Sequence, residues 1–133
     1  MPHTALLPPG WPRPKGYANG VAARSGRMVF VAGQIGWDAQ GRFPEGGLLP
    51  QTRQALNNIL AVLAEAGAGP QDIVRMTWYV TSKPDYLAAA REMGAIYREL
   101  IPNYCVAMSA VEVSALMEDA AVVEIEVSAV VPE

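Results

Sequence analysis

The chain has 133 residues, 51% of them hydrophobic and 17% charged, which is enough for one domain with a buried core and too few for two. Its formal net charge of −3 disfavours nucleic acid as a partner, because phosphate backbones are bound through clustered lysine and arginine. No secretory leader or apolar run of bilayer length occurs, so we expect a cytoplasmic protein without a membrane partner. One cysteine and one histidine are too few for the common zinc or iron sites, so no metal is expected.

The N-terminal third is predicted to hold an arm and a hairpin. Five prolines in residues 1–16 predict an irregular arm, with His3 in a loose terminus, ahead of a single domain at 17–133. Apolar runs at 17–23 and 28–35 flank the turn-forming RSGR and predict an antiparallel hairpin. Gly33 interrupts the second run, which indicates a bulge or the close approach of another group. Residues 36–47 are rich in turn formers and predict an exposed loop.

The rest of the chain alternates helix and strand patterns. Apolar residues recur at helical steps over 50–66, and Gly67 is placed to end that helix. A strand at 73–80 precedes a second helix, whose apolar face is predicted to comprise Tyr86, Ala90, Met93, Tyr97 and Leu100. Strands at 106–116 and 121–131, joined by a turn around MED, have the pattern of a pair.

The order of these elements, β-β-α-β-α-β-β, predicts an α+β domain in which one mixed sheet carries two helices on one face. The opposite face would present apolar side chains together with Glu124 and Glu126, which alternate on the last strand. Because an uncovered face of this kind is costly in water, we expect self-association to bury it.

No sequence motif of the common nucleotide-binding, serine hydrolase or zinc hydrolase classes is present. Glu124 lies in an otherwise apolar strand and is a candidate general acid or base. For Glu126 we favour a plainer role, an ion pair with Arg24, Arg27 or Arg75 across a subunit contact.

Two further side chains have a chemical and a plainer interpretation. Cys105 could be a nucleophile, but the predicted folded body offers no histidine as its base, so a small buried hydrophobe is favoured. Tyr17 opens the first predicted strand, where its phenol could hydrogen-bond a ligand, although packing is the simpler explanation.

Four segments, KGYANGV, MVFVAGQIGWD, QTRQALNNILAVLAEAGAGPQDIVRMTWYVT and VEVSALMEDAAVVEIEVSAVV, resemble the RidA/YjgF family of small trimeric proteins over roughly residues 14–131. The resemblance implies a chorismate-mutase-like fold, a homotrimer around a barrel-like core and a ligand cleft at each subunit interface. The best-known members hydrolyse reactive enamines and imines, such as 2-aminoacrylate, to 2-oxo acids and ammonia. They need no cofactor.

In that chemistry an arginine binds the substrate carboxylate, and a glutamate positions or activates the attacking water. A tyrosine and a backbone glycine complete the pocket. Carried over by position, the resemblance places the catalytic glutamate at Glu124 and the tyrosine at Tyr17. The glycine and its neighbours fall on Gly33, Gln34 and Ile35.

The arginine of the family pattern is replaced here by Met108, within CVAMSAVEV. No arginine or lysine follows Arg98, so a shift of the alignment cannot restore it. A free 2-imino acid is therefore a poor substrate, because the charge-assisted clamp on its carboxylate is lost. Met108 either lines an adaptable apolar cleft or packs in the core. The cleft residues expected on this side are Ala107, Met108, Ser109 and Trp37.

These residues leave three functions open. The first is a divergent Rid protein that binds a small metabolite and hydrolyses an enamine, imine or related bond through Glu124 and water. The second is a trimeric ligand-binding or interaction module without catalysis. The third, an endoribonuclease, is disfavoured by the acidic charge and the lack of a basic or histidine cluster.

Overall fold

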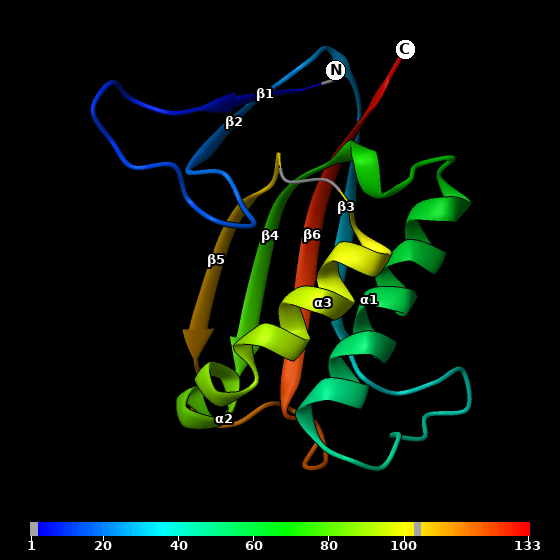
Figure 1. The fold of residues 1–133 in the computed structure, drawn as a ribbon. Helices are drawn as coiled ribbons and strands as arrows, with labels where there is room; N and C mark the ends of the chain where they lie inside the picture. Colours follow the sequence, from blue (N-terminus) through cyan, green and yellow to red (C-terminus); the bar gives the residue numbers. More distant parts are fainter. Residues whose placement is uncertain (1–2, 103–104) are drawn as a thin grey trace.

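The computed structural model describes residues 3–102 and 105–133, and the first two residues of the predicted arm lie outside this range (Figure 1). The elements are β1 (His3–Leu6), β2 (Gly20–Ala23), β3 (Gly26–Ile35), α1 (Leu48–Glu65), the 3₁₀ turn η1 (Pro70–Asp72), β4 (Ile73–Val80), α2 (Lys83–Ala88), α3 (Ala90–Leu100), β5 (Ala107–Glu112) and β6 (Val123–Pro132). A four-stranded sheet in the order β3-β6-β4-β5 carries α1 and α3 on one face. The predicted α+β class with one mixed sheet covered on one face is confirmed.

The N-terminal strands do not pair as predicted. β2 pairs antiparallel with β1 in a separate two-stranded ribbon, so the arm is not irregular throughout and His3 is buried rather than loose. β3 pairs instead with β6, where a Cβ at Gly26 would overlap the backbone of Val131. The predicted hairpin is therefore wrong, because the glycine of RSGR serves the close approach of two distant strands rather than a tight turn.

The last two strands also lack the predicted direct pairing. β5 pairs parallel with β4, and β6 lies on the other side of β4 in antiparallel register. A parallel neighbour requires a crossover connection, which α2 and α3 supply between β4 and β5. The long connection over 113–122 then lets β6 pass to the far side of β4, so that β5 remains at the edge of the sheet.

The apolar face of α1 packs against the sheet as its periodicity predicted. Ala55, Leu56, Ile59 and Leu63 are completely buried. At the end of the helix, the amide of Gly67 donates to the Ala64 carbonyl and that of Ala68 to the Leu63 carbonyl. This is a Schellman end, and Gly67 has the positive φ of 71° that it requires.

The second predicted helix is present but interrupted at Ala89, which separates α2 from α3. Met93 and Tyr97 of α3 are buried, and the Tyr97 ring lies 6.4 Å from that of Trp78 on β4. Ala90, predicted on the same face, is exposed because the helix restarts there. None of the helices in the described part of the chain combines the length and apolar character that crossing a bilayer would need.

The opposite face of the sheet carries no helix (Figure 1). Met28 and Phe30 of β3 are 61% and 69% exposed there. These side chains lie beside polar groups of β4 and β6, in the mixture that the alternating pattern predicted. That a second copy of the chain covers this face stays a prediction.

Candidate functional site

Glu124 and Gly33 come together on the open face of the sheet. Glu124 is paired with Ile35 of β3, and the register shifts between Val31 and Gln34, which marks a β-bulge around Gly33. A Cβ built at Gly33 would overlap the Glu124 carboxylate. The bulge and the close approach predicted for Gly33 are therefore both present, and the missing side chain gives Glu124 the space it occupies.

Glu126, two residues further along β6, is already engaged. Its Oε1 accepts a hydrogen bond of 2.6 Å from the hydroxyl of Tyr79. This bond raises the pKa of Tyr79, as do burial of the phenol and the charges of Glu126 and Glu124, while the charge of Arg75 opposes them. The predicted ion pair of Glu126 across a subunit contact stays a prediction.

Glu124 differs from Glu126 because no residue of the described segments donates a hydrogen bond to its carboxylate. Its side chain is half-buried rather than enclosed. A carboxylate with free lone pairs beside a bulge can hold a water molecule or a ligand donor. Of the two acidic residues, Glu124 is the one available for chemistry.

Two polar side chains of α1, which sequence reasoning missed, hold the segments that carry this site. Gln51 is buried, donates through Nε2 to the Ala120 carbonyl at 2.8 Å and accepts the Val122 amide at 2.9 Å. Asn58 donates to the carbonyls of Ile35 and Trp37 at 3.1 and 2.8 Å. The signal available was a polar residue on the apolar face of a predicted helix, which requires a partner when buried.

Gln34 and Trp37 lie on the α1 side of the sheet rather than beside Glu124. Gln34 is paired with the buried Ile125, which places it on the helix-covered face. Trp37 packs against Phe43 with tilted rings whose centroids are 5.8 Å apart. Both line an open cleft of about 490 Å³ against α1, so one protomer does not bring them to the carboxylate.

Tyr17 lies at the outer edge of β5. The amide of the next residue, Ala18, donates to the Val106 carbonyl at 2.8 Å. Ala18 also forms an isolated parallel β-bridge with Ala107. The Tyr17 side chain is 40% exposed. The structure therefore brings the segment of Tyr17 beside Ala107 at the start of β5, while a ligand-binding role for Tyr17 stays a prediction.

Met108 points to the opposite face from Glu124. It is paired with the buried Met76, packs against the core and is only partly covered. Ser109 follows on the open face beside Thr77 and is exposed. Since β4 separates β5 from β6, the two strands are two spacings apart, about 10 Å in total. Met108 is level with Val127 of β6, so Glu124 is also displaced along the strand.

One protomer thus presents two separate groups of candidate residues. We call Gly33, Ile35 and Glu124 the glutamate half-site. We call Tyr17, Ala107, Met108 and Ser109 the tyrosine half-site. Arg75 is paired with Ala107 but occupies the open face, away from the Met108 side chain. Among the described residues, β4 therefore brings no guanidinium group next to the Met108 side chain.

Cys105 and His3 both lie at a pocket under the β1–β2 ribbon, away from Glu124. Burial raises the pKa of the Cys105 thiol, which keeps it protonated near neutral pH. Over residues 3–102 and 105–133, no group of three or more His, Cys, Asp or Glu side chains is arranged to hold a metal ion.

A mixed sheet with paired helices on one face and a carboxylate on the other defines a class of small α+β proteins, and three comparisons identify the family. The model of the family described as Endoribonuclease L-PSP matches residues 12–131. The protein YyfB of Yersinia pestis, a Rid family member of unknown function, superimposes with a TM-score of 0.84 at 36% identity and covers 98% of this chain and 100% of its own. The chain belongs to the RidA/YjgF family.

Two other family members are described by an enzymatic activity or by a bound ligand. The 2-iminobutanoate/2-iminopropanoate deaminase of Capra hircus is 31% identical over 105 residues, 78% of this chain and 73% of that protein. Escherichia coli TdcF, solved with bound serine, has a TM-score of 0.70 at 30% identity and covers 96% of this chain and 91% of its own.

Proposed function

We propose that neighbouring copies of the chain complete a small-metabolite site, with the glutamate half-site of one copy facing the tyrosine half-site of the next in a homotrimer. The opposite orientation of Met108 and Glu124 supports this arrangement, because one protomer cannot direct both at one ligand. The exposed Phe30 and Met28 supply an apolar surface for such a contact.

The reaction that this site supports best is hydrolysis of an enamine, imine or related bond. An enamine first tautomerises to the imine. Glu124 would accept a proton from water as the water oxygen attacks the carbon of the C=N bond, which gives a carbinolamine, and would return that proton to the nitrogen. The C–N bond then breaks as the hydroxyl loses its proton to Glu124, which releases ammonia and leaves a carbonyl product, with Tyr17 hydrogen-bonding the substrate. The single observation that carries this proposal is the unengaged Glu124 carboxylate beside Gly33, in contrast to the bonded Glu126. A relative that is a deaminase supports the same reaction class.

The substrate of this site is expected to lack a carboxylate at the Met108 position. A flexible thioether offers dispersion contact but no charge to pair with an anion. We therefore propose a substrate that is uncharged there or anchored elsewhere, and a 2-imino acid as a poor substrate.

A coupled ammonia-release assay with freshly generated 2-aminoacrylate tests this proposal. We expect negligible turnover by the wild-type protein and a gain in Met108→Arg, whereas the matched control Met108→Leu should stay inactive. Substantial wild-type turnover would defeat the argument from the missing arginine. The same assay run over neutral enamines and imines should find a substrate whose hydrolysis is abolished by Glu124→Gln.

A non-catalytic trimeric binding module is the second candidate. It is favoured by the contact of Met108 with the core, which is what ordinary packing would give. This function would show as a ligand that binds wild type and Glu124→Gln equally and is never consumed. The endoribonuclease of the family description is disfavoured by the net charge of −3, and RNA should show neither cleavage nor salt-dependent binding.

A further inference from the structure

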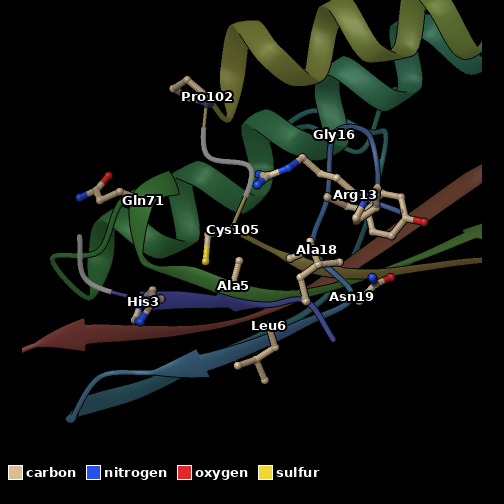
Figure 2. A pocket seen from close by; sticks show the side chains of 13 residues that line it. His3, Ala5, Leu6, Arg13, Gly16, Ala18, Asn19, Gln71, Pro102 and Cys105 are labelled. Carbon is tan, nitrogen blue, oxygen red and sulfur yellow. The ribbon is translucent and has the colours of Figure 1, made fainter. Parts of the chain in front are cut away.

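A pocket of about 660 Å³ lies between the β1–β2 ribbon and the start of β5 (Figure 2). This volume is in the range of small-molecule sites in proteins. Its wall includes apolar side chains such as Ala5 and Leu6 and a few polar ones, among them His3, Arg13 and Gln71. Glu124 does not line it, so binding at this pocket does not depend on the proposed hydrolysis.

His3 presents an unused hydrogen-bond donor at this pocket. The side chain is 3% exposed, and its Nδ1 accepts the backbone amide of Arg24 at 3.2 Å. An imidazole that accepts at Nδ1 carries its hydrogen on Nε2 when neutral. His3 Nε2 is buried and has no hydrogen-bond partner. Since a buried donor without an acceptor is unfavourable, this atom is placed to be completed by a ligand.

Arg13 supplies the charge. Figure 2 shows its side chain extending over the pocket from the loop between β1 and β2. Among the lining residues that the structure describes, Arg13 is the one with a formal charge, and none is acidic. A single guanidinium over a largely apolar wall matches one carboxylate better than a doubly charged phosphate, which would remain half-neutralised.

We propose that this pocket binds a small carboxylic acid that carries a second hydrogen-bond acceptor. The carboxylate pairs with the Arg13 guanidinium, and the second acceptor takes the hydrogen of His3 Nε2. The short carbon chain between them contacts Ala5, which lies on the same side of β1 as His3. Because Tyr17 lines the same pocket, an acid bound there lies beside the tyrosine half-site.

The chain has one histidine, so the imidazole of His3 gives an unambiguous nuclear magnetic resonance signal in untagged protein labelled with ¹⁵N-histidine. Monomethyl succinate, which has one carboxylate and an ester carbonyl as its second acceptor, is the probe, and dimethyl succinate is its uncharged counterpart. We expect monomethyl succinate to shift the Nε2 resonance of His3 saturably and the diester to leave it unchanged. Inorganic phosphate should bind more weakly than monomethyl succinate.

Two arginine variants make the test specific. Arg13→Gln should weaken the binding of monomethyl succinate by about tenfold, because a charge-assisted bond is lost. Arg91→Gln, at another exposed arginine on α3 that does not line the pocket, should leave the affinity unchanged. Since Arg13 is itself exposed, its replacement should leave the fold intact.

Any of four results would overturn the inference: no saturable shift of His3 with monomethyl succinate, equal affinity in Arg13→Gln, equal binding of the diester, or tighter binding of phosphate. A spectrum showing hydrogen on Nδ1 of His3 would do the same, because that tautomer leaves Nε2 as an acceptor.

Discussion

The contact between Gly33 and Glu124 can be measured by a double-mutant cycle. In Gly33→Ala, the nearest atoms to the new methyl group all belong to Glu124: the carboxylate oxygen Oε2, then Cδ at 2.8 Å and Cγ at 2.9 Å. Gly33 does not have the positive φ that disfavours other residues, so alanine fits the backbone. The cost of the substitution therefore falls on the Glu124 side chain, which must rotate away.

The expected magnitudes are small but separable. Forcing Glu124 from its preferred rotamer costs about 0.5–1.5 kcal/mol. Replacing glycine by alanine returns about 0.4–1 kcal/mol through the lower entropy of the unfolded chain. In the wild-type background the two effects nearly cancel. In a Glu124→Ala background the clash is absent, so Gly33→Ala should stabilise the fold by about 0.4–1 kcal/mol.

Urea unfolding of the four proteins, at one protein concentration because association would shift apparent stability, gives the coupling energy. Gly36→Ala is the matched control, since its Cβ would meet the backbone and Cβ of Gln51 at 2.6 Å. The backbone cannot rotate away, so a loss of about 1–3 kcal/mol is expected in both backgrounds. If Gly33→Ala has the same effect with and without the Glu124 side chain, the reasoning from this contact is refuted.

Three further outcomes are expected from the contacts of Gln51, Phe30 and Cys105. Gln51→Leu should lower the free energy of unfolding by about 2–4 kcal/mol, because the Ala120 carbonyl and the Val122 amide both lose their partner. A loss of stability no larger than that of a substitution at an exposed residue would contradict this prediction. Phe30→Asp should convert the proposed homotrimer to monomers in sedimentation velocity, and a homotrimer that persists in this variant would show that the open face is not the interface. Because burial raises the pKa of Cys105, its alkylation by iodoacetamide should be slower in the folded chain than in urea, and the reaction of the folded chain should accelerate only at a higher pH. Equal alkylation rates in the folded and the urea-unfolded chain would contradict the burial of this thiol.

Sequence patterns correctly predicted those elements that are determined by contacts between residues close together in the chain. The apolar period of α1 and its end at Gly67 were predictable because each rests on contacts within a few residues. Gly33 was predictable as a bulge because a glycine inside an apolar strand weakens it and usually marks a bulge or a close approach. Strand pairing was not, since an alternating pattern fixes which side chains share a face of one strand but not which strand lies beside it.

That difference determined what could be known of the candidate site. Glu124 and Met108 were each placed on the correct strand, whereas Tyr17, which was predicted to open a strand, lies in a bend ahead of β2. The separation of these residues into two half-sites depends on β4 lying between β5 and β6. The parts played by Gln51 and His3 were missed because their partners are 69–71 and 21 positions away. Hydrogen bonds across such distances leave no periodic signal in the sequence.

The separation of the two half-sites within one protomer has a genetic consequence for the proposed homotrimer. In that assembly, every complete centre would be built from two polypeptides. A copy damaged only at Glu124 and a copy damaged only at Tyr17 would then restore each other where the intact halves meet. Two defective alleles would complement when co-expressed.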